Sequence, residues 1–274
     1  MDTIRNFFIL CLGLLMLSVS CSVKPQYHDP IPVHDNFKLP SAILGETRVI
    51  NVWTPPQYHE GATALPVMYM PDGGIKEDFP HIANTLSKLI GNKSIPPFIL
   101  VGIENTDRHR DLTGASQTEG DARYAPLTDG AAKFRAFISD ELFKEIDKRY
   151  RTTDKKGIIG ESLAGLFVVE TMMRQPHMFD YYIAMDPSLW WNNHALVDSA
   201  AKTFSSFDDK AIRFWFAGSS GYGIPENTRH LDRVLKASAP ASMTWKYSDE
   251  PKEKHNTIFR ATKERAFKWT LSQI

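Results

Sequence analysis

The stretch Lys155–Met173, KKGIIGESLAGLFVVETMM, passes from a short β-branched run into an apolar helical pattern. Its corner reads GESLAG, with Gly160 two positions before Ser162 and Ala164 two positions after it. Small neighbours let a strand and the following helix approach closely, and the bend directs the serine side chain away from the sheet at the positive end of the helix. The serine is therefore either a helix N-cap or a nucleophile.

Strand-like and helix-like segments alternate on both sides of this corner. This alternation predicts an α/β fold in which helices cover both faces of a mostly parallel sheet. Ligands of such sheets bind at the carboxyl ends of the strands, so the chemistry is expected in the loops that follow them. Strands are expected at 47–53, 65–70, 98–103, 157–160, 181–185, 212–217 and 243–247, and helices at 81–90, 129–150, 163–175, 226–238 and 257–272.

The composition excludes several classes of function. The 274 residues include 42% hydrophobic residues, which is enough for a large core. Lys plus Arg and Asp plus Glu both number 32. The chain therefore lacks the excess of positive charge that is typical of nucleic-acid-binding proteins. The histidines are scattered, no H-E-x-x-H occurs, and both cysteines lie within the first 21 residues. No metal or organic cofactor is expected.

The N-terminus predicts export. A basic residue precedes the apolar run Phe7–Val19, and small residues lead to Cys21. We interpret residues 1–21 as a lipoprotein signal with Cys21 as the lipidated residue, and a plain signal peptide or an uncleaved anchor are the alternatives. The proline-bearing residues 22–40 are expected to be a linker, and 41–274 the α/β domain. The expected location is the bacterial periplasm or outer membrane, with membrane contact only through the anchor.

A histidine must activate a serine nucleophile. In the order typical of this type of corner, an acidic residue and then the histidine follow the serine. His255 lies in a polar loop between the last predicted strand and the last predicted helix. We expect it to be the general base for Ser162. The alternative is a solvated residue beside the helix N-terminus.

The acidic partner is less well defined. We expect it after the strand that ends at Ala217, where Glu226 is the first carboxylate. An acidic residue in the first turn of a helix is also favourable without any catalytic role. A serine–histidine dyad is the other alternative, and the fallback carboxylates near His255 are Asp249, Glu250 and Glu253.

The tetrahedral intermediate of ester cleavage needs two N–H donors. Leu163, directly after the serine, should provide one of them. Gly74, in the glycine-rich loop after the 65–70 strand, is expected to provide the other, with Gly73 and Ile75 as alternatives. The same loop is also compatible with a simple tight turn.

Several motifs together resemble a known family. They are VWTPPQY at 52–58, MPDGG at 70–74, ENTDRHRDLT at 104–113, the serine corner, and PSLWWNN at 187–193. Together they resemble the esterase family of α/β-hydrolases that includes esterase D, bacterial feruloyl esterases and enterochelin esterases, and they are most similar to its periplasmic siderophore-esterase branch. The resemblance implies an α/β-hydrolase fold, with Ser162 as nucleophile and His255 as base. Ala164 stands where relatives usually have glycine, and no acidic residue directly follows Ala217.

Two further pairs of residues are candidates for substrate binding. Arg108 and Arg110 follow a predicted strand and have the geometry to grip a carboxylate or catecholate oxygen. Pairing with Asp107 or Asp111 is the structural alternative. Trp190 and Trp191 follow another strand and either wall the pocket or cap the core.

The sequence therefore predicts a serine ester hydrolase that works through an acyl-enzyme on a small-molecule ester. A siderophore ester and an acylated-glycan ester are the candidate substrates. The alternatives are an inactive hydrolase-fold binding lipoprotein and an acyltransferase that uses the same residues.

Overall fold

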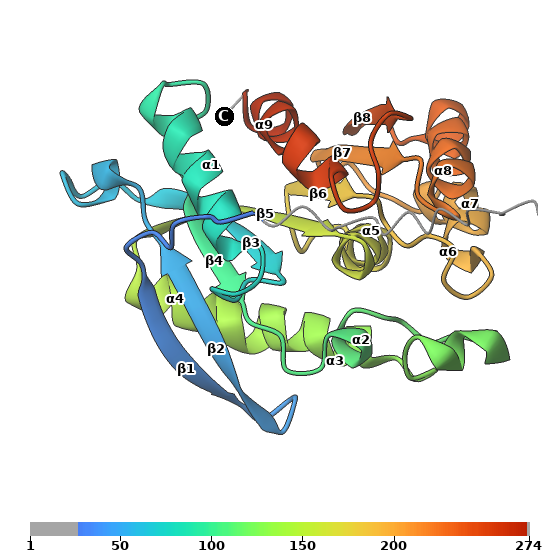
Figure 1. The fold of residues 1–274 in the computed structure, drawn as a ribbon, viewed down its shortest axis with the longest axis horizontal. Coiled ribbons are helices and arrows are strands. Elements are labelled where there is room, and N and C mark those ends of the chain that lie inside the picture. Colours follow the sequence, from blue (N-terminus) through green and yellow to red (C-terminus); the bar gives the residue numbers. More distant parts are fainter. Residues whose placement is uncertain (1–26, 273–274) are drawn as a thin grey trace, which may run out of the picture.

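A computed structural model describes residues 27–272 of the chain. Within these residues, eight strands form one sheet in the order β1-β2-β4-β3-β5-β6-β7-β8 (Figure 1). The strands are β1 (Asp35–Ser41), β2 (Glu46–Trp53), β3 (Leu65–Pro71), β4 (Ile99–Ile103), β5 (Thr152–Glu161), β6 (Tyr181–Met185), β7 (Ile212–Ser219) and β8 (Met243–Glu250).

The sheet is mostly parallel, as the sequence predicts. β1 and β2 pair antiparallel at one edge, and β2 also runs antiparallel to β4. From β4 through β8 every neighbouring pair is parallel. The carboxyl ends of β3 to β8 therefore meet along one edge of the sheet, where a ligand site is expected.

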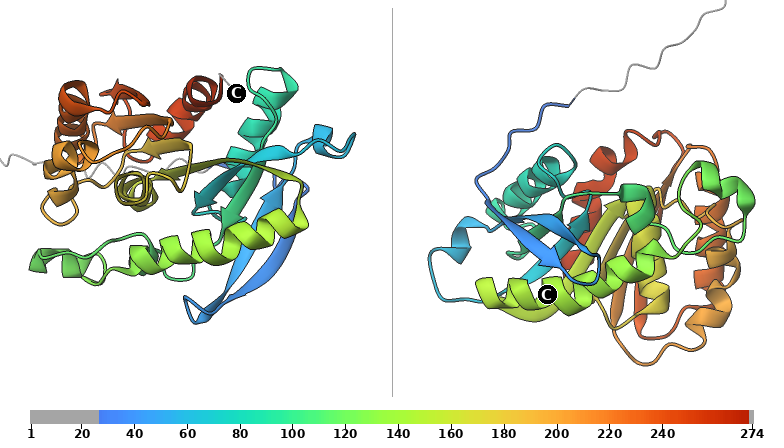
Figure 2. Two further views of the ribbon diagram at one scale, coloured as in Figure 1. Left: turned by 180° about the vertical axis from the view of Figure 1, so that it is seen from behind. Right: turned by 90° about the horizontal axis from the view of Figure 1, so that it is seen from below.

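Helices cover both faces of the sheet (Figures 1 and 2). The sheet has a hydrophobic core on each face, and alternate side chains of β3 belong to different cores. On one face, Met68 and Met70 pack with α1 (Phe79–Gly91) and α9 (Ile258–Leu271). The side chains between them pack on the opposite face. That face carries α3 (Gly130–Ala136), a π-helical turn at Phe137–Leu142, α4 (Phe143–Arg149), α5 (Leu163–Arg174) and α8 (Ile224–Ser238).

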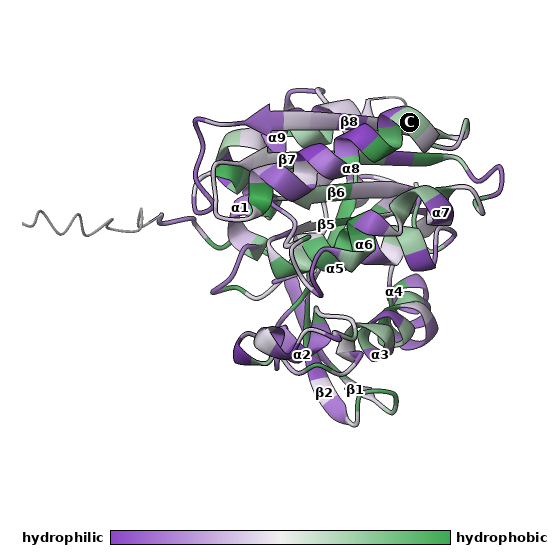
Figure 3. Cartoon of the chain, turned by 90° about the vertical axis from the view of Figure 1, so that its right-hand side faces the viewer, coloured by the Kyte–Doolittle hydropathy of each residue, from purple (hydrophilic) through white to green (hydrophobic). Residues whose placement is uncertain are grey.

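The central helix of the fold is α5. All of its residues from Leu163 to Met173 are buried, and it lies beside β5 and β6 as a largely hydrophobic segment (Figure 3). Of the residues Leu163–Met173 only Glu170 and Thr171 are polar, and a helix this apolar is enclosed by the core. This enclosure fixes the start of α5, and with it the serine corner, relative to the sheet.

The structure corrects one predicted boundary and adds short helices. The predicted linker at 22–40 extends too far, because Asp35–Ser41 pairs with β2 along its whole length. Exposed and half-buried residues alternate in β1, which is an edge strand with little apolar signal. The sequence pattern also missed α2 (Arg108–Asp111), α6 (Ala195–Asp198), α7 (Ala200–Phe204) and the 3₁₀ turns at Pro56–Tyr58 and Glu119–Arg123.

The predicted leader at 1–21 and its Cys21 lie outside the described residues. Between residues 27 and 272, no helix combines the length and hydrophobicity needed to cross a membrane.

Candidate active site

Ser162 lies at the junction between β5 and α5 with φ of 61° and ψ of −118°. Residues other than glycine rarely adopt this conformation, which places the side chain outside the turn. A side-chain carbon on Gly160 would lie 2.6–2.7 Å from atoms of Ala164, so only glycine fits there. A side-chain carbon on Gly165 would lie 2.9 Å from the carbonyl oxygen of Met185. The small residues of the corner therefore serve close packing, as the sequence pattern indicates.

Ser162 and His255 meet although they are far apart in the chain. His255 Nε2 lies 3.1 Å from Ser162 Oγ. The loop that carries His255 follows β8, and it is attached to the loop after β7 because Ser220 N–H donates to the carbonyl of Glu253 over 3.0 Å. The structure thus brings together the predicted nucleophile and the predicted base.

The acidic partner of His255 is Asp186. Its Oδ2 lies 2.9 Å from His255 Nδ1. Asp186 directly follows β6 and is completely buried. The backbone N–H of Ser219 donates to Asp186 Oδ1 over 2.6 Å, and the Ser219 hydroxyl donates to Asp186 Oδ2. A buried carboxylate with these donors is well satisfied.

This arrangement corrects the assignment of Glu226 as the acid. Glu226 lies in the first turn of α8 and is exposed, and no hydrogen bond joins it to His255 within the described residues. The acid is expected after Ala217, where the structure has Ser219 at the end of β7, and Ser219 donates hydrogen bonds to the Asp186 carboxylate. The fallback carboxylates have other partners: Asp249 pairs with Arg229, Glu250 with Arg265, and Glu253 with Thr257.

The geometry is suited to proton transfer. If His255 Nδ1 carries the proton, it donates to Asp186, and the lone pair on Nε2 then faces the Ser162 hydroxyl. A buried carboxylate holds the imidazole in this tautomer and stabilises the imidazolium that forms when the serine loses its proton. His255 is about half exposed, so its reactive edge is accessible from solvent.

The two predicted oxyanion donors differ in their present partners. Leu163 N–H stands at the start of α5, where backbone donors have no acceptor within the helix. Gly74 N–H instead donates to Glu77 Oε2 over 2.7 Å. Gly73 N–H is bonded to the carbonyl of Ile103 over 2.9 Å. Gly74 can therefore serve an oxyanion only after the Glu77 carboxylate moves away.

The two arginines predicted to bind substrate are engaged in ion pairs. Arg108 forms two bonds of 2.7 Å with Asp72. Arg110 pairs with Glu46 and Asp111 at 2.7 and 2.8 Å. Both arginines are thus paired with carboxylates, which is the structural alternative to substrate binding. Arg110 pairs with Asp111 as that alternative expects, whereas Arg108 pairs with Asp72.

The two tryptophans have different environments. Trp191 is 4% exposed, and its indole N–H donates to the carbonyl of Gly114 over 3.0 Å. It belongs to the core. Trp190 is partly exposed, packs against Tyr124 with ring centroids 5.0 Å apart, and lines a pocket. Of the pair, Trp190 is the one that lines the pocket beside the loop after β7.

Two carboxyl groups near the serine have altered acidity. Burial is the main cause that raises the pKa of Glu161 well above its ordinary value, and the nearby charges of Asp78, Asp186 and Asp72 add to this effect. Burial also raises the pKa of Glu77, although its hydrogen bonds with Gly74 and Asn105 oppose the shift. Perturbed carboxyl groups of this kind are common at functional sites.

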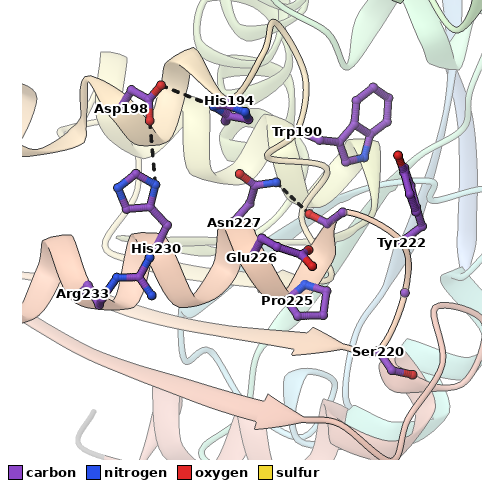
Figure 4. A pocket seen from close by; sticks show the side chains of 12 residues that line it. Trp190, His194, Asp198, Ser220, Tyr222, Pro225, Glu226, Asn227, His230 and Arg233 are labelled. Carbon is purple, nitrogen blue, oxygen red and sulfur yellow. Dashed lines mark hydrogen bonds and ion pairs between the residues drawn. The ribbon is translucent and has the colours of Figure 1, made fainter.

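An open pocket of about 810 Å³ lies beside the loop after β7 (Figure 4). The α8 face, Trp190 and the glycine-rich residues 220–223 form its walls. Across residues 27–272, no group of three or more His, Cys, Asp or Glu side chains is arranged to hold a metal ion.

The fold and these contacts define an α/β-hydrolase with a serine–histidine–aspartate arrangement at the carboxyl edge of its sheet. Residues 41–264 match the family model described as "Putative esterase", and the chain belongs to this family. The resemblance inferred from the sequence motifs is therefore confirmed, as is the predicted fold class.

Similar proteins include esterases that act on siderophores. The chain is 36% identical over 109 residues to the ferri-bacillibactin esterase BesA of Bacillus subtilis, a match that covers 38% of this chain and 36% of BesA. It is 26% identical to the apo-salmochelin esterase of Escherichia coli over 80% of this chain and 74% of that protein. The crystal structure of an IroE-like serine hydrolase from Shewanella oneidensis has a TM-score of 0.78 at 26% identity, covering 88% of this chain and 80% of that one. The matches to the first curated relatives span about a third to a half of those proteins' length.

Proposed function

We propose that this protein is a carboxylic ester hydrolase that uses Ser162 as its nucleophile. The observation that supports this most directly is the continuous series of contacts from Ser162 Oγ through His255 to the buried Asp186. A serine hydroxyl is a weak nucleophile until a base accepts its proton, and these contacts supply the base and the group that orients it.

The reaction proceeds in two halves. Ser162 Oγ attacks the ester carbonyl carbon as its proton passes to His255 Nε2, and the Leu163 N–H binds the developing oxyanion. The C–O bond to the alcohol then breaks, and the alcohol leaves with the proton from His255. Water attacks the acyl-enzyme with His255 again as base, and the acid leaves as the serine regains its proton.

We propose a siderophore ester as the substrate. The curated relatives named above are esterases of ferri-bacillibactin and apo-salmochelin, and these names describe those proteins. The open pocket beside the catalytic residues leaves space for a substrate larger than a simple acetyl ester.

Hydrolysis of a p-nitrophenyl ester by the purified domain, compared with its Ser162→Ala variant, tests the reaction. The wild type should release nitrophenol, and mass spectrometry should detect an acyl group on Ser162. Equal background rates for the two proteins would reject the nucleophile. A panel of catecholate trilactones, feruloylated sugars and short-chain esters then tests the substrate class, and a preference for short-chain esters would reject the siderophore assignment.

Export and lipidation of Cys21 are part of the same proposal. Mass spectrometry of the N-terminal peptide from cells that express the full chain would detect a diacylglyceryl group on Cys21. A mature N-terminus at another residue would reject lipidation and leave the esterase proposal unaffected.

A further inference from the structure

The turn at 186–188, directly after β6, contacts both ends of the catalytic arrangement. Asp186 binds His255, and two residues later the side chain of Ser188 reaches the nucleophile. Ser188 Oγ lies 3.4 Å from Ser162 Oγ, and Ser188 is only 3% exposed. Ser188 belongs to the PSLWWNN motif at 187–193. Its hydroxyl therefore lies beside the reacting oxygen, and the two reaction halves leave it without a role.

The backbone holds Ser188 in place independently of its hydroxyl. The Ser188 N–H donates to the carbonyl of Ser162 over 3.0 Å. The preceding Pro187 packs against the first turn of α5, since a side-chain carbon on Gly165 would lie 3.0 Å from Pro187 Cα. Because these contacts use the backbone of the turn and the proline ring, a change of the Ser188 side chain leaves them intact.

The direction of the contact between the two serines follows from the tautomer of His255. With Nδ1–H donating to Asp186, His255 Nε2 accepts the proton of the Ser162 hydroxyl over 3.1 Å. The Ser162 oxygen then has a free lone pair but no second proton to give. Ser188 must therefore be the donor. Within residues 27–272 the Ser188 hydroxyl has no other hydrogen-bond partner.

The contact is weak in the resting protein and strengthens as charge develops. Hydrogen bonds between hydroxyl oxygens usually span about 2.5–3.0 Å, whereas this one spans 3.4 Å. Catalytic hydrogen bonds are often long before the substrate binds, and they shorten in the transition state. As Ser162 passes its proton to His255, its oxygen gains negative charge, and a hydrogen bond to a charged acceptor is about twice as strong as one to a neutral acceptor. An interaction that is stronger in the transition state than in the ground state raises the rate.

We infer that Ser188 is a further catalytic residue, whose hydroxyl donates to Ser162 Oγ whenever charge develops on that oxygen. The inference rests on the proposed esterase function. In acylation, the bond from Ser162 Oγ to the acyl carbon forms while the serine proton moves to His255 Nε2. In deacylation the same bond breaks, and Ser162 Oγ is the leaving group until His255 returns the proton. Ser188 keeps its own proton in both halves.

Three substitutions at Ser188 separate hydrogen-bond donation from packing. Ser188→Ala removes the donor, and we expect kcat for a p-nitrophenyl ester to fall about tenfold, the usual effect of losing one hydrogen bond to a charged group. KM should hardly change, because acylation and deacylation slow together. Ser188→Cys keeps most of the volume, but a thiol is a weak donor, so it should be as slow as Ser188→Ala. Ser188→Thr keeps the hydroxyl and should restore kcat.

Two further measurements distinguish this role from an indirect effect through Asp186. Labelling of Ser162 by a fluorophosphonate requires only the attack of the serine, so its rate should fall about as far as kcat in Ser188→Ala and Ser188→Cys. The pH profile of kcat/KM reports the ionisation of His255 in the free enzyme. Its midpoint should stay at the wild-type value in all three variants, because Asp186 and its donors are unchanged. A shifted midpoint would mean that the substitution acts through Asp186, and it would overturn the inference.

Ser116→Ala is the matched control. Ser116 is similarly buried, at 5% exposed, but its hydroxyl donates to Asp121 over 2.7 Å. Its kcat and its labelling rate should stay near the wild-type values. Wild-type kcat in Ser188→Ala, or full activity in Ser188→Cys, would show that donation from Ser188 is not used. Loss of activity in Ser162→Ala would still support the esterase proposal in that case, so the two failures are distinguishable.

Discussion

Arg108 binds Asp72 through two parallel hydrogen bonds, from Nε to Oδ1 and from Nη2 to Oδ2, each 2.7 Å long. Asp72 directly follows β3 in a left-handed conformation with φ of 57°, and Asn105 donates to the same carboxylate over 2.6 Å. Arg108 Nη2 also approaches the carbonyl of Glu161 at 3.4 Å. One guanidinium therefore links the loop that leads to Gly74 with the residue directly before the nucleophile.

This link predicts a positioning role for Arg108. Lysine cannot reproduce a paired donor geometry, so Arg108→Lys should loosen the loop relative to the serine corner. We expect kcat to fall about tenfold or more with little change in KM, because contacts realised in the transition state are affected most. Steady-state kinetics and the rate of labelling of Ser162 by a fluorophosphonate would measure this.

Arg110→Lys is the matched control, since Arg110 belongs to the same short helix and pairs with Glu46 and Asp111. Its kcat should stay near the wild-type value. A larger change in KM than in kcat for Arg108→Lys would instead indicate direct contact with the substrate.

The buried Asp186 predicts a second effect. Asp186→Asn keeps the size of the side chain but removes the charge that holds His255 in the productive tautomer. We expect kcat to decrease by about 10²–10⁴-fold, as for loss of the acid in other serine hydrolases. Asp249→Asn is a suitable control because Asp249 pairs with Arg229 on the surface. Full activity of Asp186→Asn would mean that a serine–histidine dyad is sufficient.

Much of the fold could be predicted because its signals are local. The apolar runs that became β3, β4, β6 and β7 alternate with amphipathic helices, and this order dictates a parallel sheet. The GESLAG corner was recognisable because Gly160 and Ala164 must be small for steric reasons. β1 was missed because an exposed edge strand carries little apolar periodicity.

The missed site residues depend on tertiary contacts. Asp186 is a lone carboxylate at the end of an apolar strand, and this signal is visible in the sequence. Its partnership with Ser219 and His255 exists only after β6 and β7 pair. In the same way, nothing local shows that Gly74 N–H is engaged by the side chain of Glu77.

Glu161 predicts a pH dependence of stability. Its pKa is raised in the folded protein, so the unfolded chain ionises first as the pH rises above about 4.5. The wild type should lose stability through this group from that pH up to the folded pKa. Glu161→Gln cannot ionise, so its free energy of unfolding relative to wild type should increase between pH 4 and pH 8. Denaturant titrations at both pH values would measure this, and a constant difference would contradict it.

Lys263 predicts a stabilising substitution outside the catalytic centre. Burial, reinforced by the charge of Arg260, lowers the pKa of Lys263 from 10.5 to about 8. Below pH 8 the Lys263 amine is charged in the folded protein, and its burial then lowers the free energy of unfolding by the full amount. That cost decreases as the pH rises from 8 to 10.5, because the folded state then releases its proton before the unfolded chain does.

Lys263→Met keeps the length of the buried chain without the charge. At pH 7 it should raise the free energy of unfolding by about 1–3 kcal/mol, after allowance for the lost contacts of Lys263 Nζ with His81 Nδ1 and the His81 carbonyl. The advantage should shrink between pH 8 and pH 10.5, as thermal or denaturant unfolding would detect. Lys88→Met is a control because the Lys88 amine is exposed and pairs with Glu264 on the surface. If both variants changed stability equally, burial of the Lys263 charge would not be the cause.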